Sequence, residues 1–237
     1  IHCAAIVNVD ACEENIGLAT KIHVESTQVI ASYLASNRGR LIYISTDSVF
    51  DGKNQGAYTE KCLTNPLNVY SKTKLLGEKP VKSMGNGVVL RVNIIGGTKD
   101  GSSSFAEWLL AGLVNKTPLN LFHDVYFSPL HVIDLSVIIG EIIDKPICGI
   151  FHSGSNNSIS KYQFGIKMAN IFQLSNLSIN KVSVDSMSFK AKRPKNMTLD
   201  VKKLSSALGR DFPTVLDALM VMKSQYNDNG NLVSKIK

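Results

Sequence analysis

The feature that most constrains the fold is a regular order of short apolar runs and amphipathic segments. Helical spacing over residues 17–37 is followed by an apolar run at 41–45, helical spacing at 68–84 and a second apolar run at 88–92. Another short apolar run follows at 150–152. Continuous apolar strands that alternate with helices are typical of a parallel sheet covered on both faces. The order therefore predicts an α/β fold built on a parallel sheet.

Details of the expected elements follow from apolar periodicity and from helix-stop signals. In the first helix the expected apolar face consists of Leu18, Ile22, Val29, Ile30, Tyr33 and Leu34. Pro80 predicts a kink or an early end in the second helix, because proline removes a backbone donor. In the second half of the chain, helices are expected at 105–114, 132–143, 161–172, 200–208 and 214–224, and strands at 119–122 and 177–184. Residues 98–104 resemble a loop, and a polar tail is expected from Asn227.

Composition excludes several classes of protein. Of 237 residues, 44% are hydrophobic and 19% are charged, which indicates an ordinary globular chain with one domain or one and a half. The sequence contains no apolar run of membrane-spanning length and no signal peptide, and we expect no membrane partner. The four cysteines lack the spacing of a zinc site, so we expect no metal, reduced thiols and a cytoplasmic location.

The net charge of +7 raises the question of nucleic-acid binding. The densest basic cluster lies at residues 190–195, but no aromatic residues alternate with basic ones as in single-strand-binding proteins. A lysine-rich solvated surface, or a basic rim around an anionic small-molecule site, explains the charge better. We therefore expect no nucleic-acid partner.

Three polar side chains could form a proton-transfer site. Thr46 follows the apolar run at 41–45, while Tyr70 and Lys74 are four residues apart at the start of the second helix and so share one face of it. An ammonium group near a phenol lowers the phenol's pKa from about 10, which would make it a usable general acid. A Tyr-x-x-x-Lys pair alone is weak evidence, but its position after a strand supports it, since open α/β sheets place chemistry at strand carboxyl ends.

Several segments together resemble the extended short-chain dehydrogenase/reductase superfamily, and within it the dTDP-4-dehydrorhamnose reductase family. The matching segments are residues 2–5, Val9-Asp10, 45–52, 66–78, Leu90-Arg91, 192–196 and Leu199-Asp200. The C-terminal part is also similar to the regulatory β subunit of methionine adenosyltransferase. The resemblance implies a Rossmann-like doubly wound parallel sheet that lacks its N-terminal βα units, with a smaller C-terminal α/β substrate domain. Residues 1–97, with a return segment near 129–153, would belong to the first domain, and residues 98–237 mainly to the second.

The resemblance also implies a role for each matching residue. Thr46 would hold the substrate carbonyl, Tyr70 would protonate it, and Lys74 would bind the nicotinamide ribose and lower the phenol's pKa. The expected cofactor, NADP or NAD, would contact Cys3, Ala4, Ala5, Ser45, Tyr70, Lys74, Val92 and Asn93. The expected sugar-binding residues are Thr46, Asp47, Ser48, Asn93, Phe105 and Arg193.

Plain structural roles remain open for the same residues. Thr46 could serve only as a hydroxyl at the end of a strand that hydrogen-bonds to the backbone. Tyr70 and Lys74 could be a pair of surface side chains. Asp47 fits a cap or turn residue, and Arg193 fits a structural anchor.

The sequence differs from the family pattern at three places. The family begins with a glycine-rich turn that binds the cofactor pyrophosphate, whereas this sequence begins at a later strand and is expected to be the larger C-terminal part. Ser48 stands where the reductases usually carry tyrosine, and Asn93 is followed by two isoleucines instead of an aromatic residue. These differences favour a nucleotide sugar other than the rhamnose precursor.

The resemblance implies NAD(P)H-dependent reduction of the 4-keto group of a nucleotide-linked 6-deoxy sugar, in polysaccharide synthesis, and a possible homodimer. The alternative is a regulatory subunit that holds NADP without turnover, as in the methionine adenosyltransferase relative. That relative departs from the pattern at the tyrosine, whereas Thr46, Tyr70 and Lys74 are all present here.

Overall fold

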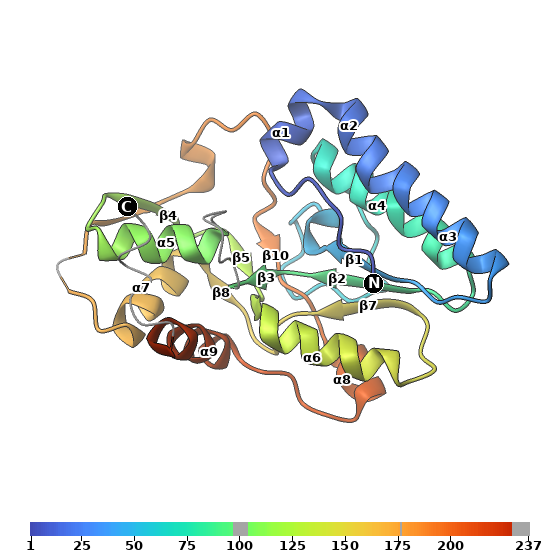
Figure 1. Ribbon diagram of the computed structural model, residues 1–237. Coiled ribbons are helices and arrows are strands. Elements are labelled where there is room, and N and C mark those ends of the chain that lie inside the picture. The colour runs from blue at the N-terminus through green and yellow to red at the C-terminus, as the bar shows by residue number, and fades with distance from the viewer. Residues whose placement is uncertain (97–103, 176, 229–237) are drawn as a thin grey trace.

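A parallel sheet in the order β1-β2-β7 lies at the centre of the first half of the molecule (Figure 1). Its strands are β1 (Ile42–Thr46), β2 (Val88–Val92) and β7 (Gly149–Ser153). A bridge from His2 to Tyr43 continues the parallel pairing beyond β1. The computed structural model describes residues 1–96, 104–175 and 177–228. The predicted α/β fold with a parallel sheet is confirmed.

Helices cover both faces of this sheet (Figure 1). One face carries α3 (Ser26–Ser36) and α4 (Val69–Ser83), and the other carries α6 (Val132–Ile143) and α8 (Lys202–Leu208). Alternate residues of each strand point to opposite faces. Leu41, Tyr43 and Val89 accordingly pack with Ala31 and Val81, whereas Ile42, Val88 and Leu90 pack with Leu135, Ile138 and Leu204. The strands are mainly apolar because both faces are covered, and the polar residues that they do contain, such as Arg91, are buried.

The helix predicted at 17–37 is continuous but its buried face is different. It consists of α2 (Ile16–Thr20), a π-helical turn η1 (Lys21–Glu25) and α3. Val29 and Tyr33 of the predicted apolar face are 69% and 67% exposed, and the buried residues include Ala19, His23, Thr27 and Ala31. The π-helical turn contains an extra residue per turn and therefore changes the helical register. Small and polar residues face α4 as a result.

Pro80 does not end α4, so the predicted early end is wrong. The helix continues to Ser83, and the Pro80 ring is buried. Because Pro80 lies in the last turn of α4, the chain loses a single helical hydrogen bond there and gains a buried apolar contact. The helix α1 (Val9–Glu14) packs against α4, and a short 3-10 turn η2 (Asp47–Val49) follows β1.

The second half of the chain has a separate hydrophobic core among short strands and three helices. The helices are α5 (Phe105–Val114), α7 (Lys161–Ile171) and α9 (Val215–Asp228). The strands form the pairs β4 (Leu119–Phe122) with β9 (Ile179–Val182) and β3 (Ile94–Ile95) with β6 (Leu130–His131), and a set in the order β10 (Asn196–Met197), β5 (Tyr126–Phe127), β8 (Ile159–Ser160). A 3-10 turn η3 (Val184–Ser186) follows β9.

Most predicted elements in this half are present. The bounds of α5, α6 and β4 agree with those predicted, while β9 is shorter and α9 runs through Asp228, beyond the expected start of the tail. The predicted loop up to residue 103, and the tail after residue 228, lie outside the described residues. Among the helices of residues 1–96, 104–175 and 177–228, none combines the length and apolar character that a membrane crossing requires.

Candidate active site

A cavity of about 510 Å³ opens at the carboxyl ends of β1 and β2. The sheet and η2 contribute the predicted residues Ser45, Thr46, Asp47, Ser48, Val92 and Asn93, α4 contributes Tyr70 and Lys74, and the N-terminal segment contributes Cys3 and Ala5. The wall opposite α4 contains Val132, Leu135, Ser136 and Ile139 of α6, which the sequence did not point to. Ten of the residues singled out in the sequence therefore line one cavity.

Thr46 and Tyr70 face each other in this cavity. Tyr70 lies in the first turn of α4, whose N-cap Asn68 accepts a hydrogen bond from the Ser71 amide at 2.9 Å. Burial raises the pKa of Tyr70 to about 12. A hydrogen bond with Thr46 lowers this pKa, but its effect is smaller than that of burial. The phenol is therefore protonated at neutral pH and can donate a proton.

Lys74 lies one turn further along α4 and is 2% exposed. Its ammonium donates to the Ile44 carbonyl at 2.5 Å and lies 4.2 Å from the centre of the Tyr43 ring. Burial lowers the pKa of Lys74 to about 8. The negative charge of Glu78 raises this pKa, but its effect is smaller than that of burial. Burial is the dominant influence on the pKa of Tyr70, and the lowering of that pKa by Lys74 stays a prediction.

Asp47 is a buried carboxylate next to these groups. It accepts hydrogen bonds from Thr46 Oγ1 at 3.1 Å and Ser48 Oγ at 3.3 Å, and also from the Asn93 side chain. Burial raises the pKa of Asp47 to about 6, while the hydrogen bonds from Asn93 and Thr46 lower it. The carboxylate is ionised at neutral pH and orients the hydroxyl of Thr46.

Two further charged or polar residues at the site were missed by the sequence analysis. The first is His23, which is fully buried in the π-helical turn and meets the Tyr70 ring edge-on at a centroid distance of 5.7 Å. Its Nε2 accepts from the Ile6 amide at 2.9 Å, and its Nδ1 lies 2.7 Å from Thr73 Oγ1, which in turn donates to the backbone of α4. These contacts require the neutral tautomer with the proton on Nδ1. Burial lowers the pKa of His23 to about 4, so the ring stays neutral and supports Tyr70.

The second is Lys161, the first residue of α7. Its ammonium lies 3.7 Å from the centre of the Phe105 ring and 4.8 Å from that of Phe127. Burial lowers the pKa of Lys161 to about 8, and the charge of Asp47 opposes this shift. The Lys161 ammonium, which belongs to the second half of the molecule, therefore interacts electrostatically with the Asp47 carboxylate of the first half. In the sequence, Lys161 is simply the first residue of a helix capped by Ser160, and that pattern does not indicate a functional site.

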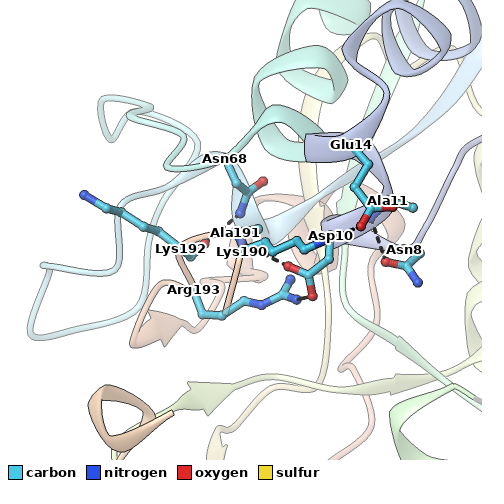
Figure 2. Close-up of polar contacts among 9 residues, drawn as sticks. All are labelled: Asn8, Asp10, Ala11, Glu14, Asn68, Lys190, Ala191, Lys192 and Arg193. Carbon is cyan, nitrogen blue, oxygen red and sulfur yellow. Dashed lines mark hydrogen bonds and ion pairs between the residues drawn. The ribbon is translucent and has the colours of Figure 1, made fainter. Parts of the chain in front are cut away.

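Three predicted site residues lie elsewhere. Ala4 does not line the cavity, and Phe105 packs against Trp108, Phe127 and Phe164 in the second core. Figure 2 shows Arg193 directed toward Asp10, with Nη2 to Oδ2 at 2.8 Å. Arg193 does not line the cavity, and a carboxylate of α1 engages its guanidinium, so its substrate-binding role stays a prediction. The alternative role of a structural anchor fits.

The residues of the cavity fit a nicotinamide nucleotide. The apolar wall from β2 and α6 suits a flat aromatic ring, and the polar wall from α4 suits hydroxyl groups. An ammonium has three donors, of which the Ile44 carbonyl takes one, so Lys74 can still donate to a ribose.

Comparison with known proteins identifies the family of the chain. The model of the family described as RmlD substrate binding domain matches residues 1–227. The "probable low-salt glycan biosynthesis reductase Agl14" of Haloferax volcanii is 28% identical over 96% of this chain and 77% of its own length. Methionine adenosyltransferase 2 subunit beta of Rattus norvegicus is 34% identical over 90% of this chain and 66% of its own length.

Solved structures show the same fold. The structure of dTDP-4-dehydrorhamnose reductase from Bacillus anthracis in complex with NADP is 25% identical, has a TM-score of 0.87, and matches 94% of this chain and 79% of the other. The chain thus spans about two thirds to four fifths of the length of these proteins. On the match to residues 1–227, the chain belongs to the RmlD substrate binding domain family.

Proposed function

We propose that this chain carries the proton-delivery and sugar-binding parts of an NAD(P)H-dependent reductase for the 4-keto group of a nucleotide-linked 6-deoxy sugar. The observation that carries the proposal is that Thr46, Tyr70 and Lys74 line one cavity whose opposite wall is apolar. The family and its named reductases support the same reaction class. Such sugars are precursors of surface polysaccharides and glycans.

Each residue of the site has a distinct part in this reaction. The nicotinamide nucleotide, when bound, supplies the hydride for the carbonyl carbon. Lys74 would hold the ribose, with Val92 and the small residues Cys3, Ala4 and Ala5 beside the nucleotide. The hydroxyl of Thr46 can turn from Asp47 to the carbonyl oxygen, where negative charge develops during reduction.

Tyr70 completes the reduction by giving its proton to that oxygen. A phenol with a pKa of about 12 is fully protonated at pH 7 and becomes a phenolate only as the alkoxide forms. The ammonium of Lys74 stabilises this phenolate. Asp47, Ser48 and Asn93 would bind sugar hydroxyls, and Lys161 would add a cation on the side of the sugar. In this scheme residues 1–97, with the return segment near 129–153, form the cofactor half, and residues 98–237 mainly form the sugar half.

A turnover assay separates this proposal from the alternative of a regulatory subunit, which the 34% identity to methionine adenosyltransferase 2 subunit beta favours. Incubation with NADPH or NADH and a dTDP-4-keto-6-deoxy sugar should oxidise the cofactor in a sugar-dependent manner. A protein that binds NADPH in a thermal-shift assay and oxidises none with the sugar present would support the regulatory role. Cofactor oxidation in the absence of sugar serves as the background.

We also propose that two copies of the chain associate through the outer face of α3. Val29 and Tyr33 are one turn apart on this face and are 69% and 67% exposed, so together they offer an apolar surface for contact with a second copy. Sedimentation velocity should give twice the chain mass of 25.8 kDa, and Tyr33→Glu should shift the protein to a monomer. A monomer at micromolar concentration in the unaltered protein would rule the dimer out.

The free thiols of Cys3, Cys12, Cys62 and Cys148 are typical of a reducing compartment. We therefore propose a cytoplasmic location. Recovery of the native protein in a membrane or extracellular fraction of its own cells would contradict it.

A further inference from the structure

The start of α4 is held in place by two elements that are distant in the sequence. Asn68 is 3% exposed and makes contacts in two directions. Its Oδ1 accepts from the Ser71 amide at 2.9 Å and caps α4, while its Nδ2 donates to the Lys192 carbonyl at 2.9 Å. On the other side, Glu13 of α1 accepts from the Val69 amide at 2.8 Å. The first turn of α4, which carries Tyr70, therefore depends on both α1 and the segment 190–193.

Asp10 joins these two elements to each other (Figure 2). One carboxylate oxygen accepts from the Ala191 amide at 2.9 Å, and the other accepts from Arg193 at 2.8 Å. The guanidinium also lies 5.2 Å from the centre of the Phe189 ring. Each of the three elements therefore contacts the other two: α1 contacts both α4 and the segment 190–193, and that segment also contacts α4. Together they form a closed junction.

The same segment leads directly to the sugar side of the cavity. After Pro194 and Lys195 the chain enters β10, which pairs with β5, and the Lys195 carbonyl accepts from the Tyr126 amide at 2.8 Å. Met197 of β10 accepts a hydrogen bond from Ser48 Oγ at 3.7 Å, and Ser48 lines the cavity. If the second half of the molecule moved, the short stretch of chain from Arg193 to Met197 would pass that movement to the first turn of α4.

We propose that Asp10, Asn68 and Arg193 are positioning residues that couple the second half of the molecule to the placement of the Tyr70 hydroxyl. They do not touch the cavity themselves and act through the N-cap of α4. Misplacement of a reacting group by about 1 Å can cost about 100-fold in rate, so a small shift of this turn has a large effect. The role of Tyr70 in this inference rests on the proposed function, whereas the mechanical coupling does not.

Two variants test the contacts of the junction while leaving the N-cap of α4 and the general stability of the protein intact. Asn68→Asp keeps an oxygen that caps α4 but removes the donor to the Lys192 carbonyl. Arg193→Gln removes the charged contact with Asp10. The matched control is Lys190→Gln, which breaks the ion pair between Lys190 of the same segment and Glu14 of α1; both side chains are exposed, and the pair includes no residue of α4.

Hydrogen exchange measured by mass spectrometry on the full chain provides a readout that does not need turnover. Amides of residues 69–75 should exchange about fivefold faster in Asn68→Asp and Arg193→Gln, as expected when a helix start loses a restraint, and should be unchanged in Lys190→Gln. Unchanged exchange in both variants would overturn the coupling. Faster exchange over the whole chain would also overturn it, because it would show a general loss of stability.

Kinetics then test the link to Tyr70. In the two junction variants kcat should fall about tenfold or more, with the KM for NADPH within about twofold of the unaltered protein, and Arg193→Lys should restore part of kcat. Local exchange that rises with no change in kcat would overturn the positioning role. If the unaltered protein shows no turnover, the proposed function fails, and the exchange measurement still decides whether the segment restrains α4.

Discussion

Replacing Tyr70 with phenylalanine should lower kcat for ketone reduction by about 100-fold or more, which is the usual contribution of a positioned general acid. The variant removes only the hydroxyl that faces Thr46 and keeps the ring that packs against His23. Substrate binding should change little, so the loss should appear in kcat instead of KM. Steady-state oxidation of NADPH with the sugar substrate measures both constants.

The matched control is Tyr33→Phe, which removes a phenol oxygen from an exposed position on α3. It should keep full activity. A Tyr70→Phe protein that is folded and as active as this control would contradict the assignment of Tyr70 as the proton donor.

Replacing Arg91 with methionine should lower the free energy of unfolding by about 3–5 kcal/mol, because it leaves the carboxylate of Glu78 buried without its partner. The two side chains form a bidentate pair at 2.9 and 2.8 Å, and they are 3% and 2% exposed. Ser45 also donates to Glu78, at 2.6 Å. Denaturation by urea measures the change.

The surface pair of Arg210 and Glu141 is the matched control, since both side chains are about one third exposed. Arg210→Met should cost less than about 1 kcal/mol. The double variant Glu78→Met with Arg91→Met should be more stable than Arg91→Met alone, because no charge is left unpaired. Equal losses for Arg91→Met and Arg210→Met would contradict the role of the buried pair.

The elements that could be predicted from sequence are those whose pattern is local. The strand at 88–92 and the helix at 132–143 have the predicted bounds because their apolar runs end at clear changes of composition. The gathering of Thr46, Tyr70 and Lys74 also followed from local facts, namely a strand end and a four-residue spacing on a helix.

Features set by distant contacts could not be predicted. The π-helical turn that brings His23 to Tyr70 depends on the close approach of α4, where a Cβ on Gly77 would lie 2.3 Å from the His23 carbonyl. The raised pKa of Tyr70 reflects burial by surrounding elements, and Arg193 binds a carboxylate far away in the sequence. Lys161 belongs to the same group, since only the folded chain places it near Asp47.

Transfer of deuterium from cofactor to sugar tests the central claim most directly. The protein is incubated with NADPH carrying deuterium at both C4 positions of the nicotinamide and with a dTDP-4-keto-6-deoxy sugar, and the product is analysed by mass spectrometry and NMR. We expect one deuterium at C4 of the product sugar, formed by the unaltered protein and formed about 100-fold more slowly by Tyr70→Phe. Binding of both compounds without deuterium in the sugar would contradict the account of this chain as a reductase.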